Sequence, residues 1–237
     1  GAYEWIRIHH GHSFGLSYHT DRLYRSMRLL GIRPVTAPDE FTEIVEVVVE
    51  ESEIEEGYVK IIVTRGSDDH NFTIPARSAL QPNVLVYGKP IDLNAIEKVQ
   101  SGVNCITLDD DRGHHCDILS LNQLNNMMAR AEAQKKNCYD AVFIKDGLLT
   151  EASHSNVCIV KAGVIWTPAT NEHMIRGVTR SLVLTRAAPS AGVTSIDEAS
   201  EPVRFEDMMT AEEVFLTNSQ DGIIPVLSID GNLIAGG

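Results

Sequence analysis

The first residues of the chain alternate between apolar and polar side chains, a pattern typical of a β-strand. This strand is expected over residues 1–8, and a tight turn at residues 10–12 follows it. Apolar residues then recur at helical spacing, which predicts a helix over about 19–30 with Ser17 or Thr20 as its cap. The chain therefore begins with a strand that leads into an amphipathic helix.

A second helix is expected over residues 39–53, with Ile44, Val47 and Val48 on its apolar side, although its many valines also suit a strand. Further strands are predicted at 58–66, 83–87 and 102–108. Together these elements predict a small α+β domain over residues 1–108.

The acidic residues 109–115 are the expected linker to a second domain over residues 116–237. That domain opens, at 116–133, with a pattern typical of a strand end that turns into an amphipathic helix. Short strands separated by hairpin turns follow, which argues for an antiparallel, β-rich domain. Its strands are predicted at 141–145, 156–161, 164–167, 213–217 and 224–229, and its helices at 179–188 and 205–209.

Composition places the chain among globular proteins. Its 237 residues suit one large domain or two small ones, and 43% hydrophobic residues are enough for a buried core. The net charge of −13 argues against a nucleic-acid partner, because no basic stretch offsets phosphate repulsion. The longest apolar runs are far too short to span a bilayer, and no signal-peptide pattern opens the chain.

Cysteines and histidines give no pattern of a metal centre. The four widely separated cysteines include no Cys-x-x-Cys pair, which favours reduced, buried thiols in a cytoplasmic protein. His9, His10 and His12 form one histidine cluster in the sequence, and His114 and His115 form another. Both clusters lie in loop-like contexts without spaced acidic or cysteine partners, so solvated or structural histidines are favoured and no metal is expected.

Two polar segments suit an anionic ligand. Arg22, on the first helix, can fork two hydrogen bonds onto a phosphate, although a helix arginine more often pairs with a neighbouring acid or stays solvated. Gly177 precedes a predicted helix, whose first amides and Thr179 hydroxyl also suit phosphate. An ordinary threonine-capped helix is the alternative there.

Two more polar segments accompany strands. The run 217–220, Thr-Asn-Ser-Gln, places small polar side chains at a strand end, where they suit either an oxyanion or a plain turn. The run 150–156 joins two hairpin strands, and its Glu151 is suited to a protonated ring nitrogen or to an exposed polar turn. None of the four segments is specific alone, but their order and spacing are.

The order and spacing match a family pattern. The stretches that carry it span nearly the whole chain: Gly1-Ala2-Tyr3-Glu4, His19-Thr20-Asp21-Arg22-Leu23, Cys116-Asp117-Ile118-Leu119-Ser120-Leu121-Asn122, Asp146-Gly147 through 151–157, Thr167-Pro168, Gly177-Val178-Thr179-Arg180 and Glu213-Val214-Phe215-Leu216-Thr217. With these stretches the chain resembles the class IV aminotransferases, the fold-type-IV pyridoxal-phosphate enzymes. The subgroup of D-amino acid aminotransferases and aminodeoxychorismate lyases is nearest.

The resemblance implies an α+β fold of two domains, a small N-terminal one and a larger β-rich C-terminal one, with a cofactor cleft between them. It implies a homodimer, and a chain that extends before Gly1 and past Gly237. The implied cofactor is pyridoxal 5'-phosphate. The implied contacts are Arg22, the amides of Val178 and Thr179, and Ser219 for the phosphate, Glu151 for the ring nitrogen, Ile175 for ring packing, and Tyr3 on the substrate side.

Two departures from the family pattern matter. The lysine that holds the cofactor as a Schiff base and moves the substrate proton aligns with Leu119, which can do neither. After Arg65-Gly66, the related D-amino acid enzymes commonly place Arg-x-His for the substrate carboxylate, whereas this chain has Asp68-Asp69-His70. An aspartate repels a carboxylate, which leaves His70 as the remnant of that motif on the substrate side.

Three hypotheses follow from the sequence. The leading one is an aminotransferase-like protein for an amino acid and a 2-oxo acid, with the usual lysine replaced by Leu119. The second is an aminodeoxychorismate lyase-like enzyme. The third is a catalytically silent relative that binds the cofactor non-covalently or holds another phosphate ligand.

Overall fold

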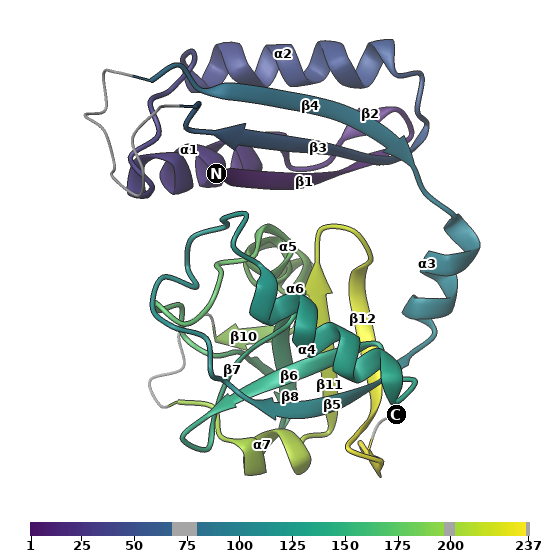
Figure 1. Cartoon of the computed structure of the whole chain (residues 1–237). Helices are drawn as coiled ribbons and strands as arrows, with labels where there is room; N and C mark the ends of the chain where they lie inside the picture. Colours follow the sequence, from purple (N-terminus) through teal and green to yellow (C-terminus); the bar gives the residue numbers. More distant parts are fainter. Residues whose placement is uncertain (68–79, 197–201, 236–237) are drawn as a thin grey trace. The chain divides into compact units, whose positions relative to one another are not determined.

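A computed structural model describes residues 1–67, 80–196 and 202–235 (Figure 1). Contacts group the chain into two units. Unit 1 comprises Gly1–Leu93 and Ile118–Asn122, and unit 2 comprises Asn94–Asp117 and Gln123–Gly237. The division therefore lies earlier in the chain than the boundary at residue 108 that the sequence suggested. The stretch expected as a linker, 109–115, belongs to unit 2.

Within the described part of unit 1, four strands form an antiparallel sheet in the order β2-β1-β3-β4 (Figure 1). Its elements are β1 (Ala2–His9), β2 (His12–Ser13), α1 (Leu16–Leu29), α2 (Pro38–Glu51), β3 (Glu56–Thr64) and β4 (Asn83–Pro90). The strand, helix, helix, strand, strand order predicted for this part of the chain is confirmed. Strand β1 pairs with β3 over its whole length.

The alternation in β1 sends every second residue into the core of unit 1. Ala2, Ile6 and Ile8 are buried together with Val59 and Ile61 of β3. Helices α1 and α2 contribute the other buried side chains of this core, namely Leu16, Leu23, Met27, Phe41, Val45 and Val49. Glu4 occupies one of the inward positions of β1 and is fully buried. A carboxylate there requires a buried partner.

Two local predictions for these helices are wrong. Helix α1 is capped by Gly15, with φ of 67°, rather than by Ser17 or Thr20, because a left-handed residue turns the chain from the β1–β2 hairpin into the helix. Helix α2 buries Val45 and Val49, whereas Ile44 and Val47 are exposed. Its sequence is apolar on two sides, so only the packing partner decides which side is covered.

The described residues of unit 2 form one nine-stranded sheet. Along its main path the strand order is β10-β9-β8-β11-β12-β5-β6-β7, and β13 pairs with β12 off that path. The strands are β5 (Val103–Asp109), β6 (Asp140–Lys145), β7 (Leu148–Ala152), β8 (Asn156–Lys161), β9 (Val164–Trp166), β10 (Thr194–Ile196), β11 (Glu213–Asn218), β12 (Gly222–Ile229) and β13 (Asn232–Leu233). The helices are α3 (Leu93–Gln100), α4 (Leu124–Lys135), α5 (Val178–Leu182), a π-helical segment (Val183–Ala187), α6 (Ala188–Ser190) and α7 (Phe205–Met209).

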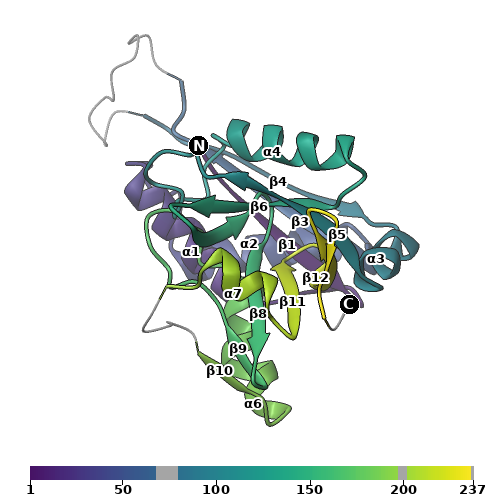
Figure 2. The same ribbon diagram turned by 90° about the horizontal axis from the view of Figure 1, so that it is seen from below.

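The sheet of unit 2 is mixed, which corrects the expectation of an antiparallel, β-rich domain. Strand β5 pairs in parallel with both β6 and β12, and β9 pairs in parallel with β10. Helix α4 makes the crossover from β5 to β6 and packs on them through Ala129 and Ala133 (Figures 1 and 2). This helix starts at Leu124, so residues 116–122 before it are not helical.

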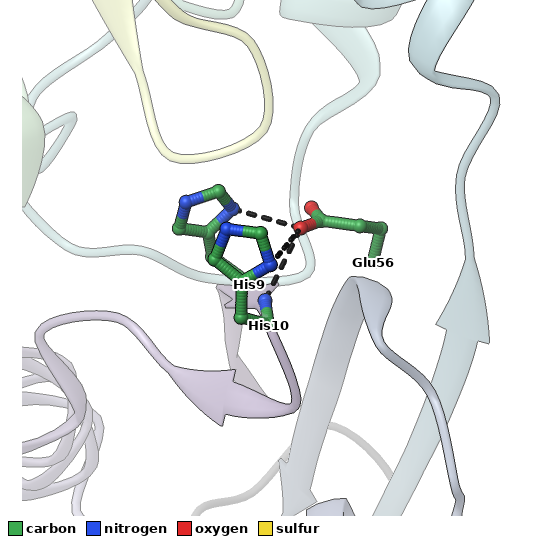
Figure 3. A group of neighbouring side chains, drawn as sticks. All are labelled: His9, His10 and Glu56. Carbon is green, nitrogen blue, oxygen red and sulfur yellow. Dashed lines mark hydrogen bonds and ion pairs between the residues drawn. The ribbon is translucent and has the colours of Figure 1, made fainter.

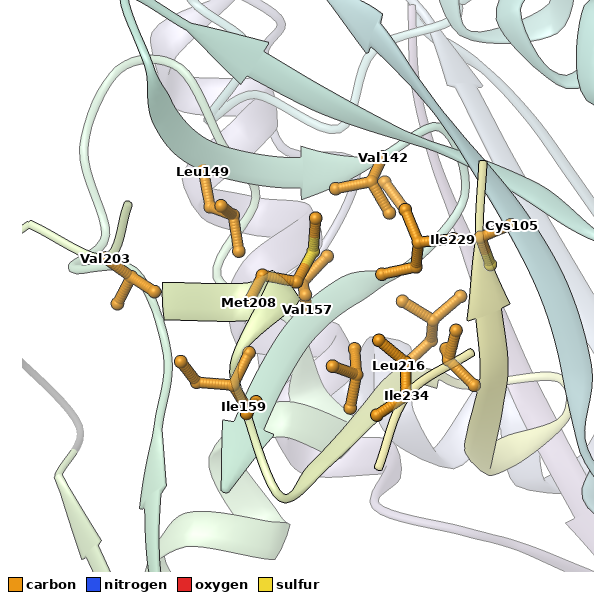
Figure 4. Close-up of a cluster of buried hydrophobic side chains, with 14 of the residues drawn as sticks. Cys105, Val142, Leu149, Val157, Ile159, Val203, Met208, Leu216, Ile229 and Ile234 are labelled. Carbon is orange, nitrogen blue, oxygen red and sulfur yellow. The ribbon is translucent and has the colours of Figure 1, made fainter. Parts of the chain in front are cut away.

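The main core of unit 2 lies where β6, β7, β8, β11 and β12 meet α7 (Figure 4). Val142, Leu149, Val157, Leu216 and Ile229 are among its buried side chains. The polar residues of interest lie at strand ends and in the loops that this core supports. In the part of the chain that the structure describes, no helix has the length and apolar character needed to cross a membrane.

Candidate functional site

Leu119 lies beside the first strand of unit 1. The amide of Tyr3 donates to the Leu119 carbonyl at 3.2 Å, and the amide of Leu121 donates to the Gly1 carbonyl at 2.8 Å. Ala2 and Ser120 form an isolated β-bridge between these two hydrogen bonds. The residue at the expected lysine position and the expected substrate-side tyrosine are therefore adjacent. Both side chains are half-buried.

Lys60 is a cation near Tyr3 that the sequence did not single out. It lies directly opposite Trp5 in the β1–β3 pair. Its Nζ is 5.8 Å from the centre of the Tyr3 ring and 4.4 Å from that of Trp5, close enough for cation–π attraction. Burial lowers the pKa of the Lys60 ammonium. Alternation along two paired strands was the signal that could have placed Lys60 and Tyr3 on one face.

Arg22 is held by an ion pair with the buried Glu4. Its Nε donates to Glu4 Oε1 and its Nη2 to Glu4 Oε2, both at 2.8 Å. The ring of His19 adds a third contact, from Nδ1 to Glu4 Oε2 at 2.7 Å. Because a carboxylate only accepts hydrogen bonds, His19 Nδ1 carries the proton in this contact. The acid that pairs with Arg22 is therefore Glu4 of β1, and not a neighbour along the helix.

Electrostatics keep Glu4 ionised. Burial acts to raise the pKa of its carboxyl, but the Arg22 guanidinium and the His19 ring outweigh burial and leave the pKa lowered. Burial lowers the pKa of His19, against the opposing pull of Glu4. The ion pair orients the Arg22 guanidinium, and it also offsets part of the charge that would attract a phosphate.

In unit 2, Arg112 is shared by two buried carboxylates. Its Nη1 donates to Glu151 Oε1 at 2.6 Å, while its Nε and Nη2 donate to Asp110 at 2.9 and 2.8 Å. The Thr150 hydroxyl donates to Asp110 Oδ2 at 2.8 Å, and the Ile175 amide donates to Glu151 Oε2 at 2.9 Å. Glu151 is thus a buried carboxylate at the end of β7 rather than an exposed turn residue.

One guanidinium cannot neutralise two buried carboxylates. Asp110 takes two of the Arg112 bonds, and although burial raises its pKa, Arg112 and Thr150 leave it lowered. For Glu151 burial prevails over Arg112 and the Ile175 amide and raises the pKa to about 7. Fully ionised, the cluster would carry one surplus negative charge, which either a proton on Glu151 or a bound cation beside it offsets.

The loop that contains Ile175 and Gly177 is fixed by its neighbours. Asn156 Nδ2 donates to the Ile175 carbonyl at 2.8 Å, so the backbone of Ile175 is held by Asn156 on one side and Glu151 on the other. A Cβ at Gly177 would lie 2.0 Å from Asn156 Oδ1, so any larger residue there would displace the Asn156 side chain. Helix α5 begins at Val178 with no side-chain cap, which excludes the threonine-capped helix considered above.

The end of β11 meets this loop. Thr217 lies opposite Asn156 in the β8–β11 pair, and α5 contacts β11. The buried Thr217 Oγ1 finds no hydrogen-bond partner among the described residues. The Asn218 side chain accepts from the amides of Gln220 and Asp221, at 2.9 and 2.7 Å, and so shapes the turn that carries Ser219.

In unit 2, Glu151 holds the loop of Ile175 that leads into Val178 and Thr179, and Ser219 follows β11, the strand that α5 contacts. Unit 1 brings Tyr3 next to Leu119 and fixes Arg22 through Glu4. His70 lies outside the described residues. The sequence analysis missed Glu4, His19, Asp110 and Arg112. The signal for Glu4 was a charge at an inward position of an alternating strand, whereas Asp110 and Arg112 were hidden in an acidic run typical of a linker.

Comparison with known proteins identifies the family. A model of the family "Amino-transferase class IV" matches residues 1–229. The chain belongs to the class IV aminotransferases. Among relatives of this family, a D-alanine aminotransferase of Bacillus licheniformis is 36% identical over 237 residues, which cover all of this chain and 81% of the relative. A D-alanine aminotransferase of Listeria monocytogenes is 33% identical over 238 residues, with the same shares covered.

Solved structures share the fold-type-IV architecture. A branched-chain aminotransferase from Thermoproteus uzoniensis superimposes with a TM-score of 0.86 at 25% identity, over all of this chain and 80% of that one. A putative 4-amino-4-deoxychorismate lyase from Legionella pneumophila gives a TM-score of 0.83 at 21% identity, over all of this chain and 85% of that one. The α+β fold expected for class IV aminotransferases is therefore confirmed.

Proposed function

We propose that this class IV aminotransferase binds pyridoxal 5'-phosphate and serves an amino acid and a 2-oxo acid, with Leu119 in the place of the usual lysine. The relatives named D-alanine aminotransferase support this proposal. So does a structure of the same fold titled as the pyridoxal-phosphate-bound form of a Mycobacterium tuberculosis aminotransferase.

The observation that carries the proposal is the buried Glu151 carboxyl, which shares its one arginine, Arg112, with Asp110 and whose pKa burial raises to about 7. A protonated pyridine nitrogen is a cation with one N–H donor, which matches a buried carboxylate that a single arginine only partly neutralises. The Ile175 amide and Arg112 fix the Glu151 oxygens at 2.9 and 2.6 Å, so the acceptor is oriented before the ligand arrives. When bound, this cofactor acts as an electron sink for a carbanion at the substrate carbon.

The residues at the other end suit a phosphate. The first amides of α5, from Val178 and Thr179, receive no side-chain cap. Gly177 lets the backbone pass close to Asn156, and the Thr217 hydroxyl lacks a partner among the described residues. Backbone amides and hydroxyls of this kind bind phosphate oxygens well. Ser219 and Arg22 stay predicted phosphate contacts, the latter with its charge partly offset by Glu4.

Leu119 limits what the bound cofactor can do. A leucine side chain has no amine and no titratable proton, so residue 119 neither attaches the cofactor nor moves a proton at the substrate carbon. We therefore propose non-covalent binding. On the substrate side, Tyr3 and Lys60 would orient an anionic substrate, since Lys60 brings an ammonium within 5.8 Å of the Tyr3 ring.

Two alternatives share this site. One is an aminodeoxychorismate lyase-like reaction, which the fold of the Legionella protein makes reasonable. The other is a catalytically silent protein that holds the cofactor or another phosphate ligand. Two turnover assays distinguish the three functions: transamination between D-alanine and 2-oxoglutarate, and cleavage of aminodeoxychorismate. A catalytically silent protein forms product in neither assay. We further propose a homodimer and a cytoplasmic location, and light scattering on the purified protein tests the former.

Absorbance titration of the purified protein with pyridoxal 5'-phosphate tests the binding proposal. We expect saturable binding, and no cofactor-sized mass gain after borohydride treatment. Glu151→Gln should weaken binding by about 10- to 100-fold, because it removes a charge-assisted hydrogen bond worth about 1.5–3 kcal/mol. Glu213→Gln, at an exposed position of β11, is the matched control and should bind as the wild type does. Equal affinity of all three proteins would refute the role of Glu151.

A further inference from the structure

The hairpin between β1 and β2 gathers histidines at one end of the unit 1 sheet. His9 ends β1, His10 and Gly11 form the turn, and His12 lies directly opposite His9 in the β1–β2 pair. His9 and His10 are well exposed, with 58% and 77% of their side-chain surface accessible. The cofactor contacts proposed above use none of these residues.

The backbone of the turn brings two successive side chains together. In a regular strand neighbouring side chains point to opposite faces. His10, however, has a positive φ of 49°, which is uncommon for a residue with a Cβ and turns its ring toward that of His9. The two ring centres are 4.1 Å apart. This local geometry makes both imidazoles available on one side of the hairpin.

Glu56, at the start of β3, faces the two rings (Figure 3). His9 Nδ1 lies 2.9 Å and His10 Nδ1 lies 3.6 Å from the same carboxylate oxygen, Oε1. The His10 amide also donates to this oxygen at 3.1 Å. Figure 3 shows all three lines converging on one atom. Two ring nitrogens and one carboxylate oxygen thus meet at a single point on the surface of unit 1.

Arg7 orients the Glu56 carboxylate from the other side. Its Nη2 pairs with Oε2, and its Nη1 donates to the Gly57 carbonyl at 3.2 Å. Arg7 and Glu56 are only 17% and 18% exposed, so this arrangement is more rigid than an ordinary surface pair. Oxygen Oε1 is left facing the histidines. A carboxylate that is hydrogen-bonded through one oxygen while it ligates through the other is common around protein-bound metals.

We propose that His9, His10 and Glu56 bind a divalent cation of the zinc class. One ligand atom from each of the three residues lies within 4.8 Å of the others. In a tetrahedral zinc centre with bonds of about 2.0–2.1 Å, neighbouring ligand atoms are about 3.3 Å apart. The two nitrogen–oxygen distances above, 2.9 and 3.6 Å, bracket that spacing. Two imidazoles with one carboxylate form a ligand set typical of Zn²⁺ rather than of Mg²⁺ or Ca²⁺.

Neighbouring groups complete the site. His12 lies opposite His9 in the β1–β2 pair, so its side chain is on the same face of the hairpin, and it could supply a fourth ligand in place of water. The positive charge of Arg7 opposes a cation. The carboxylate of Glu55 lies beside the same turn and offsets this positive charge. Both of its oxygens are 3.8 Å from the position that a Cβ on Gly11 would occupy. The sequence favoured solvated histidines because Glu56 is far from them along the chain.

A second histidine group supplies an internal control. His114 Nδ1 and His173 Nε2 lie 3.2 and 3.7 Å from Glu172 Oε1. Glu172 is 57% exposed, whereas Glu56 is 18% exposed and paired with Arg7. The carboxylate of this second group is therefore less constrained, and more ordering entropy would be lost on metal binding. His114, with 72% exposure, matches His9 and His10 in accessibility.

The test is equilibrium dialysis of the full chain, prepared without an affinity tag, against Zn²⁺ followed by metal analysis. We expect about one equivalent bound by the wild type, and binding weakened about tenfold or more in His9→Ala/His10→Ala and in Glu56→Gln. His114→Ala should bind as the wild type does. Far-ultraviolet circular dichroism of each variant confirms folding, and the high exposure of both histidines makes unfolding of the double variant unexpected.

Nuclear magnetic resonance locates the site independently. A substoichiometric amount of Ni²⁺ should broaden amide signals of residues 7–13 and 55–57 first. Broadening centred on residues 114 and 172–173 would overturn the proposal. So would zinc binding that is unchanged in the His9→Ala/His10→Ala variant, or weak binding of several equivalents that is the same in every variant. The readout is metal binding alone, so its failure is distinct from a failure of cofactor binding.

Discussion

Glu151→Gln should change how the stability of this protein depends on pH. In the wild type, burial raises the pKa of Glu151 to about 7 from a usual value of 4.5. The folded state therefore keeps a proton that the unfolded chain releases between those pH values. Because the folded state binds the additional proton, the free energy of unfolding falls as pH rises through this window.

The size of the effect follows from the width of the window. Each pH unit in which only the folded state keeps the proton costs about 1.4 kcal/mol, so the loss approaches about 3 kcal/mol when pH rises from 4.5 to about 7. Glutamine stays neutral throughout and removes this loss. Its amide group can still accept from Arg112, but an NH₂ facing the Ile175 amide adds a penalty of about 1–3 kcal/mol that does not depend on pH.

The assay is urea unfolding of the cofactor-free wild type and of Glu151→Gln at several pH values from 5 to 8, with circular dichroism as the measure of the folded fraction. The informative quantity is the difference between the two unfolding free energies. It should shift in favour of the variant by about 2–3 kcal/mol from the acidic to the alkaline end. Parallel profiles would show that Glu151 does not hold a proton in this window, and the surplus-charge argument would then be wrong.

Three further predictions concern other residues. Leu119→Lys should give a cofactor that remains attached after borohydride reduction, as seen by mass spectrometry. Absence of that adduct would mean that other residues besides Leu119 also prevent covalent attachment. Glu4→Gln should destabilise unit 1 by about 3 kcal/mol in chemical unfolding, because it leaves the largely buried Arg22 without its counter-charge. An unchanged unfolding midpoint would contradict that account. Gly177→Ala should cost about 1–3 kcal/mol and weaken cofactor binding, since its Cβ displaces Asn156. A substitution of Gly113, where a Cβ meets nothing within 4 Å, is the control.

Local pattern determined much of the fold. The alternation in β1, the Asp146-Gly147 turn and the strand β11, which ends at Asn218, all involve residues close together in the sequence. Periodicity and turn residues act over a few positions, so they can be identified without knowing what packs against them. The order of polar segments was also sufficient to indicate the family and to single out Glu151 and Gly177.

Long-range packing decided the rest. Arg112 joins Glu151 and His173, which are 39 and 61 residues away, so an acidic run typical of a linker became a buried cluster. Glu56 likewise meets His10 only through the tertiary fold, because 46 residues separate them in the chain. The covered side of α2 and the parallel pairs of β5 likewise depend on partners that local pattern does not specify. Leu119 shows the division most clearly. The sequence by itself determined that residue 119 carries no amine, whereas only the tertiary structure placed it beside Tyr3, because that contact is made by backbone groups more than a hundred residues apart.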